Sequence, residues 1–285
     1  MSSLLNNPAI QSSLLPLLLA LGLSGLIRLA FGPHAGARLA SAAIAIGFLA
    51  SLLLIQIPVF PPRSASQKLP YLVALALVLG LVIDALNLRG RLRQGIGFVL
   101  SLIALGWLLG SRIERIDLAG WVLILLLIAV ALLATLRSSA TRERLDGGIM
   151  LLFASGGVGA ISLIGASASI AQTGFAMMAA CGGFLLWNWP RVRFPLGASG
   201  HYVLITALTA LCAQLLFFTK ASGWALLLLT PLLLIDLLQA RLPGLRNVTQ
   251  PGPRALCLAT LGALICALAI AVALLLSADS ASGYY

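Results

Sequence analysis

Charged side chains are scarce in this chain. Only 9% of its 285 residues are Asp, Glu, Lys or Arg, against about 25% in ordinary soluble domains. No polar stretch is long enough to build a core of its own, so a separate soluble domain is excluded and residues 1–285 form a single transmembrane domain. Apolar residues make up 61% of the chain and recur in runs of about 20, long enough to cross a bilayer. The sequence predicts an all-α, polytopic membrane protein.

Several common motifs are also missing. The four cysteines lie in or beside apolar runs and form no CxxC pair, so they are expected to be small core residues, not disulfides or metal ligands. The opening residues MSSLLNNPAIQSS lack a basic stretch, so we expect no cleaved signal peptide. The net charge of +11 comes without basic patches interleaved with stacking aromatics, so nucleic acid is not an expected partner.

The apolar runs divide into ten predicted membrane helices. The weakest break between them is the segment GASASIAQTG, which separates the sixth run from the seventh. The ten predicted segments are residues 14–31, 39–57, 71–88, 95–110, 118–136, 149–166, 169–187, 201–218, 224–238 and 255–276.

The basic residues are distributed unevenly between alternate loops, as the positive-inside rule requires. Thirteen lie in the odd-numbered loops, five lie in the even-numbered loops, and the two tails have none. This asymmetry predicts that the odd loops face the cytoplasm and that both termini lie outside. The thirteen are Arg28, Arg38, Arg89, Arg91, Arg93, Arg137, Arg142, Arg144, Arg191, Arg193, Arg241, Arg246 and Arg254; the five are Arg63, Lys68, Arg112, Arg115 and Lys220.

Four of the seven acidic residues fall at the predicted cytoplasmic face: Asp84, Glu143, Asp146 and Asp236. Asp84 is near the end of a predicted helix. A carboxylate within a membrane span is costly, which makes a functional or pairing role the first hypothesis. The alternative is that Asp84 reaches the aqueous surface or pairs with Arg89 or Arg91.

The segments GGFLLWNWPRVRFPLGASGH and GLVIDALNLRGRLRQ resemble two motifs of bacterial polyprenyl-phosphate N-acetylhexosamine-1-phosphate transferases, the family that includes the phospho-MurNAc-pentapeptide translocase. The loop GGFLLWNWPRVRFPLGASGH follows the pattern of the family's loop between the seventh and eighth helices. The segment GLVIDALNLRGRLRQ follows the pattern around its paired aspartates. In-register matches are Gly183, Phe184, Leu185, Asn188, Pro190, Arg193, Gly197 and Gly200 in the first segment, and Gly80, Leu81, Asp84, Leu88, Arg91, Leu92 and Arg93 in the second.

Weaker matches extend the resemblance along the chain. TRERLDGG places Glu143 and Asp146 at two acidic positions of a third family motif, and Pro231 with Asp236 resembles the start of the family's ninth helix. The departures are specific. Ala198 occupies the position of a magnesium-binding aspartate, Ile83 replaces the first aspartate of a pair, and His201 replaces a serine.

The resemblance implies ten helices with both termini outside, in a bacterial inner membrane. It also implies transfer of a sugar phosphate from a nucleotide sugar, a UDP-sugar, to polyprenyl phosphate at the cytoplasmic face, with Mg²⁺ as cofactor. The candidate catalytic residues are Asp84, Asp146 and Glu143. The candidate substrate-binding residues are Asn188, Arg191, Arg193 and His201; no metal ligand is assigned because the expected one is Ala198.

Three functions remain open at this point. The first is a divergent sugar-1-phosphate transferase of cell-envelope synthesis whose catalytic carboxylates are partly lost. The second is a non-catalytic relative that binds polyprenyl phosphate, another membrane lipid or a membrane partner subunit. The third is a transporter of a small molecule or lipid, although the sequence shows no matched halves and its acids lie at helix ends.

Overall fold

The computed structural model describes residues 8–110, 112–137, 146–219, 221–234 and 250–282. All regular secondary structure in these ranges is helical. Seven long helices are α2 (Leu15–Phe31), α5 (Ala65–Ala85), α6 (Arg91–Leu109), α7 (Leu118–Arg137), α8 (Asp146–Ile164), α9 (Ala168–Trp187) and α10 (Ala198–Phe218), and the last helix is α15 (Pro251–Ser282).

Eight helical stretches among the described residues are long and apolar enough to cross a membrane. The first stretch is Ile10–Leu39. It contains the short helix η1 (Ile10–Leu14), then α2, then the short helices η2 (Gly32–Gly36) and α3 (Ala37–Leu39). These stretches confirm a polytopic membrane protein. Two shorter apolar stretches fall on the second and ninth predicted segments: α4 (Ala42–Ile55), and Gly223–Leu233, which contains α11 (Gly223–Leu227) and α12 (Thr230–Leu233). Ten crossings therefore stay a prediction.

Local capping explains why some helices begin earlier than the apolar runs indicate. The α5 helix begins at Ala65, before the predicted residue 71, because Ser64 and Gln67 form a reciprocal capping box that satisfies free N–H groups,. The α6 helix begins at Arg91, directly after Gly90. Gly90 has a φ of 77°, a backbone conformation that glycine adopts more easily than other residues,. Hydrophobicity locates the apolar centre of a helix, whereas caps set its ends.

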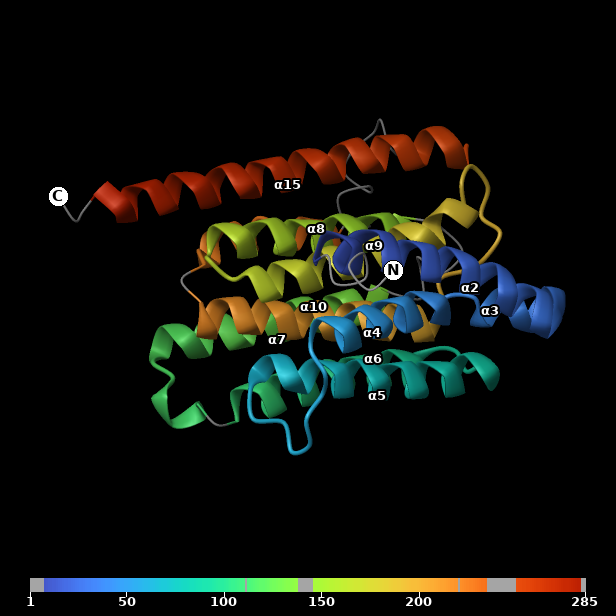
Figure 1. The fold of residues 1–285 in the computed structure, drawn as a ribbon, viewed down its shortest axis with the longest axis horizontal. Helices are drawn as coiled ribbons and strands as arrows, with labels where there is room; N and C mark the ends of the chain where they lie inside the picture. The colour runs from blue at the N-terminus through green and yellow to red at the C-terminus, as the bar shows by residue number, and fades with distance from the viewer. Residues whose placement is uncertain (1–7, 111, 138–145, 220, 235–249, 283–285) are drawn as a thin grey trace.

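The α10 helix lies at the centre of the bundle (Figure 1). In its most apolar stretch 78% of the residues are buried, against 28% in α15. Figure 1 shows α15 as an outer layer beside α8, and α5 with α6 on the opposite side. The α8 and α9 helices pack closely at glycines: a Cβ on Gly174 would lie 2.8 Å from the Cα of Gly159. Small residues at such contacts let membrane helices approach.

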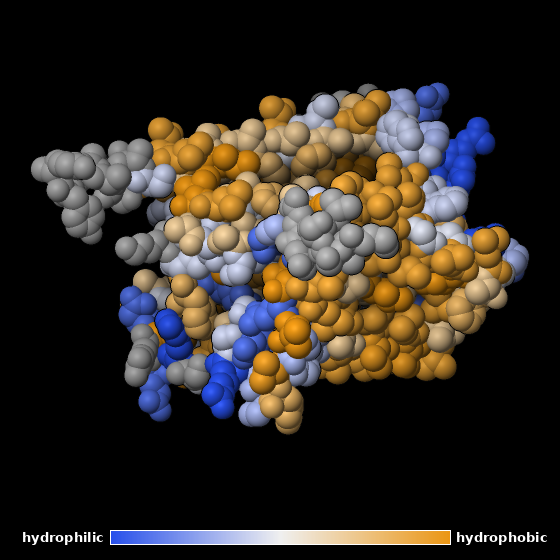
Figure 2. All heavy atoms as spheres, viewed as in Figure 1, coloured by the Kyte–Doolittle hydropathy of each residue, from blue (hydrophilic) through white to orange (hydrophobic). Residues whose placement is uncertain are grey.

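The surface has the polarity of a membrane protein. Figure 2 shows hydrophilic side chains mainly toward the two ends of the bundle, with a mostly hydrophobic surface between them. At one end Lys68 donates to the carbonyl of Trp107 at 2.7 Å, and the Arg112 guanidinium lies 4.3 Å from the ring centre of Phe218. Cations beside aromatic rings are typical of the water–lipid boundary. The loop between α9 and α10 lies at the opposite end (Figure 1), which we call the base-rich end because it also holds Arg89, Arg91 and Arg254.

Candidate functional site

The carboxylate of Asp84, at the end of α5, binds the beginning of α10. Its Oδ1 accepts the backbone N–H of Ala198 at 2.7 Å. Its Oδ2 accepts the backbone N–H of Ser199 at 2.9 Å and the Ser199 hydroxyl at 2.8 Å. The residue before the helix, Gly197, has no side chain to cap it. Asp84, which is 1% exposed, therefore supplies from another helix the acceptor that an N-cap residue normally supplies.

Ser41 extends this contact to the start of α4. Its hydroxyl accepts the backbone N–H of Gly197 at 3.0 Å and lies 3.0 Å from the Ser199 hydroxyl. Since the Ser199 hydroxyl donates to Asp84, Ser41 donates to Ser199. A continuous hydrogen-bonded chain thus runs from Gly197 through Ser41 and Ser199 to Asp84. All four groups are buried, so this polar cluster is fully enclosed.

Two motif glycines allow this contact. A Cβ on Gly80 would collide with the Cα of Ser199, and a Cβ on Gly197 would collide with Oδ2 of Asp84. Any larger residue would separate α5 from the start of α10. The matches at Gly80 and Gly197 in the two resembling segments therefore have a structural explanation in this chain.

Asn188 shapes the loop between α9 and α10. Its side-chain Oδ1 accepts the backbone N–H of Arg193 at 2.8 Å and that of Phe194 at 2.7 Å, and the side chain is fully buried. The ring of Phe194 packs 5.9 Å from that of Trp187. In this arrangement Asn188 folds its own loop, while the side chains of Arg191 and Arg193 are exposed at the base-rich end.

Asp146, the first residue of α8, forms an ion pair with Arg254 in the first turns of α15. The guanidinium Nη2 lies 2.6 Å from Oδ2, and Nε lies 3.2 Å and 3.1 Å from the two carboxylate oxygens. The Asp146 side chain is 3% exposed and that of Arg254 is 16% exposed. This pair attaches the outer helix to the bundle. Two other acidic candidates, Glu143 and Asp236, lie outside the described residues.

His201 occupies the first turn of α10 and is 6% exposed, with an Nε2 atom that has no hydrogen-bond partner. The next residue, Tyr202, donates its hydroxyl to the carbonyl of Arg93 at 2.5 Å. Arg93 is itself 3% exposed, although the sequence suggests a loop position for it. Sequence reasoning counted Arg93 as a topology base and as an in-register match to the family motif, but did not select it as a site residue.

The described residues at this end do not fit a Mg²⁺ ion. Such an ion takes oxygen ligands, with one or two carboxylates from the protein. Here Asp84 already accepts three hydrogen bonds, Asp146 is paired with Arg254, and Ala198 offers only a buried methyl group. Within the described ranges, no three His, Cys, Asp or Glu residues gather as a metal site requires.

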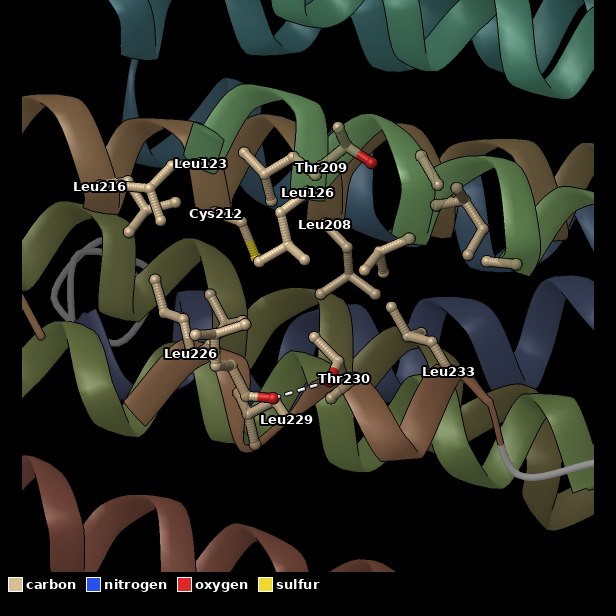
Figure 3. A pocket seen from close by; sticks show the side chains of 18 of the residues that line it. Leu123, Leu126, Leu208, Thr209, Cys212, Leu216, Leu226, Leu229, Thr230 and Leu233 are labelled. Atoms are coloured by element: carbon tan, nitrogen blue, oxygen red, sulfur yellow. Dashed lines mark hydrogen bonds between the residues drawn. The ribbon is translucent and has the colours of Figure 1, made fainter. Parts of the chain in front are cut away.

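A second feature is an apolar cavity at mid-bundle, enclosed by α7, α8, α10, α11 and α12 (Figure 3). All the space between its lining atoms, together with the open solvent at its mouth, measures about 710 Å³. Figure 3 shows Leu126 and Leu208 on one side of this space, facing Leu226 and Leu233 on the other. Sequence reasoning missed the cavity. Its one signal is Pro231, which breaks the ninth apolar run into two short helices,.

No protein-family model matches the chain, and no curated protein sequence is significantly similar to it. The resemblance to sugar-1-phosphate transferases therefore rests on the two loop segments and the predicted topology. The structure brings those two segments into direct contact through Asp84 and Ser199. The carboxylate of Asp146, from the weaker third match, pairs with Arg254 of α15.

Proposed function

We propose that this protein binds the hydrocarbon chain of a membrane lipid of the polyprenyl-phosphate class, and that it does not catalyse sugar-phosphate transfer. The observation that carries the proposal is the apolar cavity between α7, α10 and α11–α12. In this proposal the protein is a multi-pass component of a bacterial inner membrane, acting in a cell-envelope pathway, with the base-rich end in the cytoplasm.

The lining of the cavity supports a hydrocarbon ligand. Among the described residues that line it, only Thr209, Thr230 and Cys212 have a polar side-chain atom. The Thr230 hydroxyl already donates to the carbonyl of Leu227 at 2.7 Å. A surface of this kind gains free energy by covering apolar groups and offers little to a sugar or a nucleotide.

The cavity is open on one side. Leu126 lines it and is 36% exposed. The short helices α11 and α12 form the opposite wall, and the break between them interrupts the close packing of an ordinary helix. A lipid chain could therefore enter sideways from the bilayer, without passing through water.

The engaged carboxylates support the second half of the proposal. Phosphoryl transfer depends on charge neutralisation, usually by Mg²⁺ held through carboxylates. Asp84 holds the start of α10 and Asp146 holds Arg254, so both have structural partners. The loop keeps in-register matches such as Asn188 and Arg193, while Ala198 stands where the resemblance implies an aspartate. This combination supports a relative that binds a lipid and does not catalyse the transfer.

Lipid binding is tested by filling the cavity. The purified protein in nanodiscs is titrated with a polyprenyl monophosphate, and binding is measured by native mass spectrometry. Val130→Trp places an indole in the cavity, whereas Leu125→Trp places the same group on the exposed side of α7, where Leu125 is 63% exposed. We expect Val130→Trp to lose most binding and Leu125→Trp to bind as the wild type does. Equal binding by the two variants would refute the cavity as the site.

The absence of transfer is tested separately. Wild-type protein is incubated with polyprenyl phosphate, Mg²⁺ and a panel of UDP-sugars, and the extracted lipid is analysed for a lipid-linked sugar diphosphate. We expect none. A product that disappears in Asp84→Asn, with the protein still folded, would instead establish the divergent transferase and assign a catalytic role to Asp84.

A further inference from the structure

His201 continues the cavity-lining face of α10 toward the base-rich end. The α10 residues that line the cavity include Ile205, Leu208, Cys212 and Leu216. Their spacing places them on one side of the helix, and His201 precedes Ile205 by one turn. The imidazole therefore follows the cavity lining along the same helix face, at the membrane end where a lipid headgroup lies.

The buried imidazole has an unused polar atom. His201 is 6% exposed, and its Nε2 has no hydrogen-bond partner among the residues that the structure describes. Buried polar atoms in native proteins nearly always have a partner, so this exception needs an explanation. A ligand atom that exchanges a hydrogen bond with Nε2 would provide one.

The surroundings of His201 favour an anion. Arg93 is 3% exposed and lies at the start of α6, and its backbone carbonyl contacts Tyr202, the residue next to His201. The Tyr202 hydroxyl donates a hydrogen bond to the backbone carbonyl of Arg93 and so connects α6 to α10. The first two N–H groups of α10 are already bound by Asp84, so these two groups are not available to an anion.

We propose that His201 and Arg93 bind the phosphate headgroup of the lipid whose hydrocarbon chain occupies the cavity. This inference rests on the proposed lipid binding and assigns the headgroup site to residues of this chain. The phosphate lies beside the first turn of α10, near the base-rich membrane face. The hydrocarbon chain then runs along α10 past Ile205 toward Leu216.

The test compares a polyprenyl monophosphate with the matching polyprenol, which lacks the phosphate. His201→Phe keeps a ring of similar size and removes both nitrogens. We expect its dissociation constant for the phosphate to rise about tenfold, as the loss of a hydrogen bond to a charged group predicts. Its affinity for the polyprenol should stay at the wild-type value.

Thr206→Val is the matched control. Thr206 is fully buried on α10 and its hydroxyl oxygen also has no hydrogen-bond partner. Five residues from His201, it lies about 140° away around the helix. The Thr206→Val substitution removes a buried hydroxyl but leaves the side of α10 that lines the cavity unchanged. Both ligands should therefore bind to this variant as they bind to the wild type.

The remaining outcomes separate the two proposals. If His201→Phe binds the phosphate as tightly as the wild type, the headgroup site is wrong while lipid binding stands. If the wild type binds neither the phosphate nor the polyprenol, lipid binding itself fails. Inorganic phosphate is the third probe: competition with the lipid phosphate in the wild type and not in His201→Phe supports the headgroup site, and equal competition in both proteins overturns it.

Discussion

Asp84 and Ser199 are 115 positions apart in the chain, yet the Asp84 carboxylate accepts both the backbone N–H and the hydroxyl of Ser199, at 2.9 Å and 2.8 Å. The contact fixes the first turn of α10, the most buried of the described long helices, to the last turn of α5. A charge that is costly inside a membrane protein is stabilised here because it replaces the missing cap of a helix.

Replacing Asp84 should destabilise the protein even if the protein has no catalytic activity. Asp84→Ala leaves the N–H groups of Ala198 and Ser199 buried without acceptors, and should lower the free energy of unfolding by on the order of 2–3 kcal/mol. Asp84→Asn keeps one acceptor oxygen and should lose less. Denaturation of purified protein in mild detergent, followed by tryptophan fluorescence, measures both. A wild-type midpoint for Asp84→Ala would show that the contact contributes no stability.

The close approach of α5 to α10 predicts a glycine effect with a matched control. Gly80→Ala should destabilise the protein by about 1–3 kcal/mol, because the new methyl group would overlap the backbone of Ser199,. Gly95→Ala makes the same change inside α6, where nothing lies within 4 Å of the added Cβ. It should be neutral or stabilising by up to about 1 kcal/mol. Thermal unfolding of the two variants in parallel checks the difference, and similar losses in both would contradict the proposed close contact.

The sequence predicts the helices of this protein better than it predicts the contacts between them. Apolar runs of about 20 residues reveal where helices lie because each must satisfy its backbone hydrogen bonds internally within the bilayer. The break at residues 165–167 is found correctly, and Ala166 adopts a φ of 57° there. Helix ends such as Ala65 depend on Ser64 and Gln67, which hydropathy does not register.

Side-chain partners were not predictable from local pattern. Asp84 precedes Arg89 and Arg91 in the sequence, so a nearby ion pair is a reasonable expectation, but its partners come from α10. Asp146 likewise meets Arg254, 108 positions away. The cavity needs side chains from five helices, and none of them is unusual for a membrane segment. These features follow from tertiary packing. The spacing of residues along one sequence does not show which helices pack together.

The ion pair between Asp146 and Arg254 should couple α15 to α8. Asp146→Ala and Arg254→Ala should each destabilise the protein, since each leaves a largely buried charge without this partner,. The double variant should recover part of the loss, with an interaction energy of about 0.5–3 kcal/mol. Unfolding of the wild type, both single variants and the double variant gives this energy from one cycle. Strictly additive losses would show that the two side chains act independently.

The orientation of the bundle is tested by a pair of cysteine substitutions of the same kind. Arg63 and Arg89 are both exposed arginines, in the loops that precede and follow α5. The distribution of basic residues predicts that Arg63 lies outside and Arg89 in the cytoplasm. In a background with Cys257→Ser, which removes the one exposed native cysteine among the described residues, an impermeant maleimide should label Arg63→Cys in intact cells. Arg89→Cys should react only after permeabilisation. The reverse pattern would show that the topology is inverted and that His201 and Arg93 lie at the outer face. Labelling of both variants in intact cells would show that α5 does not cross the membrane.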